Sequence, residues 1–309
     1  MIWAFIFISN SIRYFYFHQK KETNKFMKKI LVPIDFSKPS LLAVDTAADI
    51  ARKAGAELIL LHVVEEAVGN SMNVEGQVTE GGDWQERLFT MKLIEKAKKQ
   101  LAKVLEDPKL EGVKVRTELR LGSPYHGMNA MVTERKVDLV VMGTAGHSDL
   151  EHMIIGSNTE KVVRMSHCPV LTLHNKPLNK DFKDIVYATS MSKDEEVFSK
   201  IVRRTQQLYE ATVHLVRINT PGNFQRDTVV KKYMTDFAKK LQLKNFTINV
   251  FNDVTEEEGI IYFAESINAD LIAMATHGRT GFAHVLAGSI AEDVVRHSKR
   301  PVLTFVTKK

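Results

Sequence analysis

The chain has 309 residues, of which 44% are hydrophobic and 26% are charged, a balance typical of an ordinary globular protein. Its single cysteine, Cys168, excludes an internal disulfide and a metal cage of several thiolates, and it favours a reducing compartment. Residues 1–26 carry half of the net charge of +6, so the remaining chain is too mildly basic to indicate a nucleic-acid-binding protein.

Residues 1–26 combine an aromatic, apolar stretch with a basic end. Ser9, Asn10 and Arg13 interrupt this stretch, so it is too short for a membrane span, and it lacks the features of a secretory signal. Two alternatives stay open: an anchor at a membrane surface, and an extension that is disordered or not part of the native fold. We expect the second alternative, with the folded chain beginning at Met27 and a cytoplasmic location.

The remaining chain contains two copies of one sequence pattern. Residues 163–173 match residues 295–305 at 7 of 11 positions, with an offset of 132. Nearer the start of each copy, residues 28–37 align with residues 183–192, with an offset of 155. The second copy is therefore shorter in its middle.

The glycine-rich stretch at 69–82 has no counterpart in the second copy, so we expect the length difference there. We expect two domains, at 27–175 and 182–309, joined by a polar linker that contains Pro177. The length of the chain agrees with two domains, since each copy is large enough to bury its own core.

Within each copy, short apolar runs alternate with long amphipathic stretches. Runs that are apolar on both faces are typical of strands buried between layers of helices. We expect strands at 30–34, 57–64, 113–119, 138–142, 169–173, 184–189, 212–218, 246–251, 270–274 and 301–306. We expect helices at 39–54, 84–106, 124–135 and 157–166, and another that starts at 193. This alternation predicts an α/β fold of two repeated doubly wound domains, each with a mostly parallel sheet.

In doubly wound sheets, ligands bind at the carboxyl ends of the strands, where the strand order reverses. After the fourth strand of the first copy, Gly143 and Gly146 are followed by Gly156 and Ser157, which open a helix. Glycines let a ligand approach the backbone, and the free N–H groups of a helix start favour an anion such as phosphate. We expect Ser157 to cap this helix, and the hydroxyls of Ser157 and Thr159 to meet the anion.

Asp35 follows the first strand, where a carboxylate can hold the hydroxyls of a ribose. Each glycine pair alone is ordinary turn and cap chemistry. The pattern becomes specific only when its two spacings, the strand before it and the helix after it are taken together.

Together these residues resemble the ATP-binding members of the universal stress protein family, and the likeness covers both copies. The family motif G-x2-G-x9-G-[S/T] is matched from residue 143 to Ser157, and residues 30–37 match the family's first strand. The resemblance implies two five-stranded parallel sheets, each ordered 3-2-1-4-5 with helices on both faces. It implies that ATP or another adenine nucleotide binds, with Mg²⁺ or Mn²⁺ held mainly by phosphate oxygens and water.

The resemblance also implies which residues of the first copy form the site: Asp35 on the ribose, the Val63 backbone on the adenine edge, and Gly143 near the ribose. The phosphates would lie among the residues that follow. The implied nucleotide-binding residues are Pro33, Asp35, Val63, Gly143, Gly146, Gly156, Ser157, Asn158 and Thr159.

The second copy departs from this motif. Ser190 stands where Asp35 does, Ala275 replaces the first glycine, and Arg217 and Ile218 replace His62 and Val63. Two alternatives stay open: a degenerate site, which we expect, and a weaker anion site at the start of the last helix. The residues of that weaker site would be Gly278, Arg279, Gly288 and Ser289.

Other groups that look reactive have plainer explanations. His147, Asp149 and His152 form a poor metal template and are expected to be solvated. Cys168 has no evident base and is expected to pack in the core, and residues 95–107 are expected to form a solvated helix surface.

We expect a nucleotide-dependent regulatory protein with one ATP site, in the first copy, and at most slow hydrolysis, because no general base or arginine finger is evident. Two alternatives stay open: a protein-interaction scaffold that uses no nucleotide, and an enzyme that acts on an adenylated substrate. The final strands are expected to be sheet edges that need covering. The resemblance implies that these edges pair the two copies within one chain, with further homodimerisation open. We expect an unidentified protein partner, no nucleic acid and no membrane span.

Overall fold

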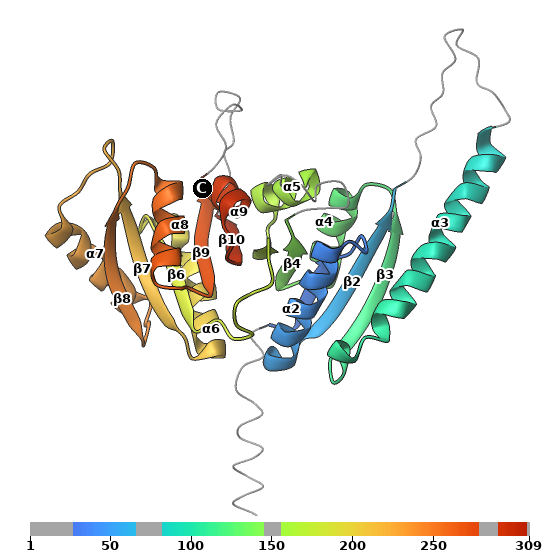
Figure 1. The fold of residues 1–309 in the computed structure, drawn as a ribbon, viewed down its shortest axis with the longest axis horizontal. Coiled ribbons are helices and arrows are strands. Elements are labelled where there is room, and N and C mark those ends of the chain that lie inside the picture. The colour runs from blue at the N-terminus through green and yellow to red at the C-terminus, as the bar shows by residue number, and fades with distance from the viewer. Residues whose placement is uncertain (1–26, 66–81, 145–155, 278–289, 308–309) are drawn as a thin grey trace, which may run out of the picture.

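The computed structural model describes residues 27–65, 82–144, 156–277 and 290–307. In this part of the chain, one continuous sheet has the strand order β3-β2-β1-β4-β5-β10-β9-β6-β7-β8. The first five strands and their helices form domain 1, and the last five form domain 2 (Figure 1). Each domain has the order 3-2-1-4-5, which confirms the predicted pair of doubly wound domains.

All neighbouring strands inside each domain are parallel. The strands of domain 1 are β1 (Lys29–Pro33), β2 (Glu57–Val64), β3 (Lys114–Leu121), β4 (Leu139–Gly143) and β5 (Val170–Leu173). The strands of domain 2 are β6 (Asp184–Ala188), β7 (Thr212–Asn219), β8 (Phe246–Asn252), β9 (Leu271–His277) and β10 (Val302–Thr307). The two domains meet where β5 and β10 pair antiparallel, as predicted for the final strands.

Helices cover both faces of the sheet and create two cores. The helices of one face are α2 (Lys38–Ala54), α3 (Gly82–Leu105), α6 (Glu196–Tyr209) and α7 (Asp227–Lys240). The helices of the other face are α4 (Pro124–Arg135), α5 (Ser157–Met165), α8 (Glu256–Ser266) and α9 (Ile290–His297). Along β1, Ile30 and Val32 lie in the first core and Leu31 in the second. Inner strands such as β1 are apolar because both of their faces are buried, whereas the edge strands β3 and β8 are partly exposed and carry polar residues.

Helix α2 shows why the local sequence folds as it does. Ser37 is its N-cap and accepts a hydrogen bond from the backbone N–H of Ser40 at 3.3 Å. Pro39 lies in the first turn, where its missing N–H removes no helical hydrogen bond. Gly55 ends the helix in the left-handed conformation, at φ 66°. These features explain why α2 begins and ends close to the bounds of the helix expected at 39–54.

The predicted length difference between the two copies lies between the second strand and the helix after it. In domain 1, residues 65–81 connect β2 to α3, whereas residues 220–226 connect β7 to α7 in domain 2. Helix α3 also has 24 residues and α7 has 14. On α3, Leu101 is buried and Leu105 is exposed, so the apolar face of this predicted solvated helix is only partly covered.

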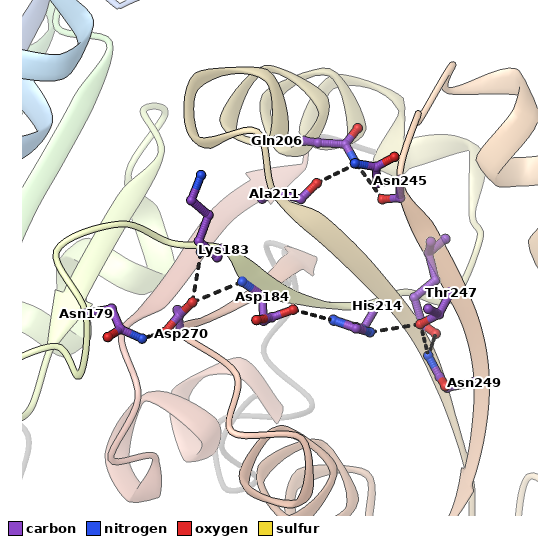
Figure 2. A network of polar contacts seen from close by, with 11 residues as sticks. Asn179, Lys183, Asp184, Gln206, Ala211, His214, Asn245, Thr247, Asn249 and Asp270 are labelled. Atoms are coloured by element: carbon purple, nitrogen blue, oxygen red, sulfur yellow. Dashed lines mark hydrogen bonds and ion pairs between the residues drawn. The ribbon is translucent and has the colours of Figure 1, made fainter.

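The linker between the domains is fixed to the amino ends of the strands of domain 2 (Figure 2). Asn179 donates to the buried carboxylate of Asp270 at 2.7 Å. The same carboxylate accepts from the backbone N–H groups of Lys183 at 2.8 Å and Asp184 at 3.0 Å. It therefore holds the start of β6 beside the start of β9. Asp138 accepts from two backbone amides at the start of β1 in the same way.

Helices α5 and α9 lie beside each other above the junction of β5 and β10 (Figure 1). Arg164 of α5 donates from Nε and Nη2 to the two carboxylate oxygens of Glu292 of α9, at 2.9 and 2.7 Å. Glu292 is 4% exposed, so this bidentate ion pair joins the two domains through a buried carboxylate.

Among the helices that the structure describes, none is both long and apolar enough to cross a membrane.

Candidate functional site

The carboxyl ends of β1 and β4 form the edge of domain 1 at which the strand order reverses. Strand β1 ends at Pro33, and β4 ends at Gly143. Helix α5, whose N-cap is Gly156, begins close to the end of β4. The structure thus brings the described members of the predicted site to one edge of the sheet.

Two contacts fix the start of α5 to the end of β4. The N–H of Gly156 donates to the carbonyl of Thr144 at 2.8 Å. The hydroxyl of Thr159 donates to the carbonyl of Gly143 at 3.1 Å. Because Thr159 is buried and its hydroxyl is used in this way, it positions the helix, a different role from the predicted contact with an anion.

The N-cap of α5 is Gly156, and no side chain caps this helix. The expectation that Ser157 caps it was wrong, because Ser157 is already the first helical residue. Ser157 is exposed, and Asn158 is half-buried. The first N–H groups of an α-helix have no partner inside the helix and carry its positive dipole end. The first turn of α5 can therefore receive an anion through backbone N–H groups.

Gly143 has a packing role that the sequence did not reveal. A Cβ atom on Gly143 would lie 2.7 Å from the Cβ of Pro39 and 2.8 Å from its carbonyl carbon. The missing side chain therefore lets the first turn of α2 lie against the end of β4. The sequence analysis assigned this glycine to the approach of a ligand, and the structure gives it a packing function as well.

Asp35 lies in the exposed turn between β1 and α2. Its Oδ1 accepts from the backbone N–H of Ser37 at 3.0 Å and from the Ser37 hydroxyl at 2.5 Å. Phe36 between them has a φ of 65°, an unusual value for a residue other than glycine. This turn holds the carboxylate at the edge of the sheet.

Val63 lies near the end of β2, past the point where β1 has ended. The pairing of β1 with β2 begins at Lys29 and Glu57 and ends at Pro33 and Leu61. Just beyond it, the Leu61 carbonyl accepts from the backbone N–H of Ile34 at 2.8 Å. Because backbone groups alternate in direction along a strand, the N–H and C=O of Val63 point to the same side as those of Leu61. They face the space beyond the end of β1.

The same edge of domain 2 carries a buried carboxylate that the sequence analysis missed. Glu195, which is 2% exposed, accepts from the hydroxyls of Tyr187 at 2.9 Å and Thr189 at 2.5 Å. It also accepts from the N–H of Ser190 at 2.9 Å and from its hydroxyl at 2.5 Å. Ser190, the counterpart of Asp35, thus serves as a donor to a neighbour in its own domain. A run of polar residues after β6 was the signal that could have indicated this network.

Helix α6 of domain 2 also begins differently from its counterpart α2 in domain 1. Residues Lys193–Glu195 form a 3-10 turn before α6 begins at Glu196, so the helix expected to start at 193 opens with a tighter turn. In domain 1, α2 is regular from Lys38. Domain 2 has Ala275 at the position of Gly143, so it has a side chain where domain 1 has none.

Several predicted site residues lie outside the described residues. These are Gly146, Gly278, Arg279, Gly288 and Ser289, together with His147, Asp149 and His152 of the rejected metal template. Their predicted roles stay predictions. Within the described ranges, no group of three or more His, Cys, Asp or Glu side chains could hold a metal ion.

Cys168 packs in the core, as expected. It is 2% exposed, and its thiol donates to the carbonyl of Val137 at 3.3 Å. Burial raises the pKa of this thiol above its usual range, so the reactive thiolate is strongly disfavoured.

Comparisons with known proteins agree with this architecture. The family model described as the universal stress protein family matches residues 27–174 and again residues 181–305. A universal stress protein of Methanocaldococcus jannaschii is 32% identical over 169 residues, which cover 54% of this chain and 95% of that relative. One from Bacillus subtilis is 36% identical over 147 residues, which cover 46% of this chain and 96% of that relative. Each of these two relatives therefore corresponds to about half of the chain.

The solved structure of a universal stress protein from Archaeoglobus fulgidus covers 90% of this chain and 96% of its own. Its TM-score is 0.69 at 20% sequence identity, so this likeness shows the shared fold. Since the family model matches both halves of the sequence, the chain belongs to the universal stress protein family and contains two copies of its domain.

Proposed function

We propose that domain 1 binds ATP or another adenine nucleotide and that the protein acts as a nucleotide-dependent stress-response regulator. The observation that carries this proposal is the attachment of α5 to the end of β4, through Gly156 to Thr144 and Thr159 to Gly143. This attachment directs the first turn of a helix, a site that favours phosphate, toward the edge at which doubly wound folds bind nucleotides.

The other parts of the proposed site have matching chemistry. The carboxylate of Asp35 lies at the exposed end of β1 and accepts hydrogen bonds, as contact with ribose hydroxyls requires. The backbone of Val63 presents a donor and an acceptor beyond the end of β1, which suits the edge of an adenine. The phosphates would be held by Gly146, Gly156, Ser157 and Asn158, with Mg²⁺ or Mn²⁺ bound mainly by phosphate oxygens and water.

We propose that domain 2 has no equivalent site. Ser190 replaces the carboxylate of Asp35 and is hydrogen-bonded to Glu195. The proposed role is binding with at most slow hydrolysis, in which nucleotide occupancy changes contacts with a protein partner. A cytoplasmic location and further homodimerisation stay part of this proposal.

Isothermal titration of the full chain with ATP and Mg²⁺ tests the proposal. We expect one saturable site per chain. Asp35→Ala removes a charged acceptor, so we expect about a tenfold loss of affinity, whereas Ser190→Ala at the matching position of domain 2 leaves the affinity unchanged. Binding with no effect of Asp35→Ala contradicts the proposed site.

Two further outcomes distinguish the alternatives. An absence of heat at millimolar ATP, from protein free of carried-over nucleotide, favours a scaffold that uses no nucleotide. Turnover well above about 1 per second favours an enzyme. Mass spectrometry of small molecules that remain bound through native purification identifies the physiological ligand.

A further inference from the structure

Domain 2 contains a hollow of about 490 Å³ between α7 and the carboxyl ends of β6 and β7. Met191, in the turn after β6, and Arg217, near the end of β7, line it from the sheet. Tyr233, Phe237 and Lys240 line it from α7. The hollow lies on the α6–α7 face, since the buried residues of these helices share one core.

Arg217 has an unsatisfied donor at this hollow. Its Nε atom is buried and has no hydrogen-bond partner within the described part of the chain. A desolvated guanidinium N–H without an acceptor is costly, so an acceptor on a bound ligand would stabilise this position. The residue as a whole is half-buried and lines the hollow, so part of its side chain borders that space.

The same position in domain 1 has a different chemistry. There His62 replaces Arg217, and its Nδ1 is hydrogen-bonded to the carbonyl of Ile34 at 2.7 Å. The His62 ring also packs against Phe36, with 4.7 Å between the ring centroids. Domain 1 thus satisfies this position internally, whereas domain 2 has a cation with a buried donor.

The hollow adjoins the edge of domain 2 that corresponds to the predicted nucleotide edge, since Ser190, the counterpart of Asp35, also lines it, but it extends over the α6–α7 face. Successive side chains of a strand point to opposite faces, and Ile218, the counterpart of Val63, lies in the core on the other face. The residues suggested for a weak second anion site begin at Gly278, after β9, and none of them is among those that line the hollow.

The lining combines two cations with one anion and apolar surface. Arg217 and Lys240 are positive, Asp236 is negative, and the rings of Tyr233 and Phe237 provide apolar contact. We propose that this hollow binds a small organic anion, with its carboxylate or phosphate on Arg217 and Lys240 and its apolar body against the rings.

The nearby carboxylate of Glu195 is engaged by donors of its own domain. Its oxygens accept four hydrogen bonds, from the hydroxyls of Tyr187, Thr189 and Ser190 and from the Ser190 N–H. Hydrogen bonds from donors that point at a carboxylate stabilise its charge locally. Arg217 is the cation of the hollow whose Nε–H has no acceptor within the described part of the chain.

The test uses benzoate as a probe and benzamide as its neutral analogue, each added to the full chain without ATP. The readout is the NMR signal of the Arg217 Nε–H, identified by its loss in Arg217→Gln, with affinities from titration calorimetry. We expect benzoate to shift this signal saturably and benzamide to bind at least about tenfold more weakly, since the carboxylate supplies the missing charged acceptor.

Variants separate binding from folding. We expect Arg217→Gln to weaken benzoate binding by about tenfold, and Lys240→Ala, an exposed change on α7, by about threefold. Lys239→Ala is the matched control because Lys239 is also exposed on α7 but does not line the hollow, and we expect no change. If Arg217→Gln fails to fold, the benzoate affinities of Lys240→Ala and Lys239→Ala still test the proposal, because only Lys240 lines the hollow.

Equal binding of benzoate and benzamide, equal affinities of the two lysine variants, or an Nε–H signal that does not saturate overturns the proposal. Phenyl phosphate in place of benzoate distinguishes a phosphate-bearing ligand from a carboxylate. The inference does not depend on nucleotide binding in domain 1, since Asp35→Ala is expected to leave benzoate binding intact.

Discussion

At the scale of single residues, the two domains differ most in how they use a carboxylate after the first strand. In domain 1, Asp35 is exposed, and its Oδ1 accepts from the backbone N–H and the hydroxyl of Ser37. In domain 2, Glu195 is buried and collects hydroxyl donors from Tyr187 and its neighbours. The first arrangement places a carboxylate at the surface, where the proposed ribose contact lies, and the second holds the turn together through hydrogen bonds.

Tyr187 makes this buried network sensitive to alkaline pH. Burial, and then the nearby charge of Glu195, raise the pKa of the Tyr187 phenol well above its ordinary value of about 10. Above about pH 10 the unfolded chain loses this proton while the folded chain keeps it, so stability is complete below that pH and falls as pH rises.

We expect Tyr187→Phe to lose about 1 kcal/mol at neutral pH, because the hydrogen bond to Glu195 is removed. Above pH 10 its stability should fall less steeply than that of the wild type, by up to about 1.4 kcal/mol per pH unit. Urea unfolding at pH 8 and at alkaline pH measures both effects. Tyr233→Phe, on an exposed ring, is the control; the same slope in wild type and Tyr187→Phe contradicts the argument.

At the scale of elements, most of the fold could be predicted from the sequence. Strands buried on both faces, such as β1 with Ile30, Leu31 and Val32, are apolar throughout and are easy to locate. Helix α2 carries its own signals in Pro39 and Gly55. These features are local, and local patterns are what a sequence displays directly.

The details of the site were harder to predict because they depend on contacts between distant segments. The hydroxyl of Thr159 is directed by the carbonyl of Gly143, and the hollow at Arg217 exists only because α7 lies beside β7. The choice of Gly156 over Ser157 as N-cap is a shift of one residue, a common error for helix boundaries. No spacing in the sequence records such contacts.

The contact between Gly143 and Pro39 leads to a test of the packing of α2 on β4. We expect Gly143→Ala to destabilise the protein by about 1–3 kcal/mol, because its Cβ would lie 2.7 Å from the Pro39 Cβ. Thermal or urea unfolding measures the loss. Gly222→Ala is the matched control, since a Cβ there meets nothing within 4 Å, and a cost below about 0.5 kcal/mol is expected. Equal effects of the two changes would show that the close contact is relieved without cost.

At the scale of the whole molecule, the two domains are joined by sheet pairing and by an ion pair. Strands β5 and β10 make the sheet continuous, and Arg164 of α5 reaches Glu292 of α9. The hydrogen bonds to Glu292 raise the pKa of Arg164, so the guanidinium stays charged. Because α5 begins at the proposed nucleotide edge, this pair connects that edge with domain 2.

We expect Arg164→Met to lower the free energy of unfolding by about 1–3 kcal/mol, since it removes two charge-assisted hydrogen bonds to a buried carboxylate. Glu160→Gln, which removes only the exposed i,i+4 pair of the same arginine, should cost about 0.3–0.5 kcal/mol. Urea unfolding of both variants makes the comparison. If Arg164→Met costs no more than Glu160→Gln, the pair does not stabilise the junction.

The antiparallel junction of β5 and β10 has a consequence for symmetry. In a homodimer built on such a seam, every substitution appears twice, and both pockets must change together. Here one polypeptide contains both domains, so their sequences can differ: domain 1 has Asp35 after its first strand, whereas domain 2 has Ser190 and Glu195. Because both domains lie in one chain, a substitution in one domain leaves the other unchanged, so the two domains can differ in function.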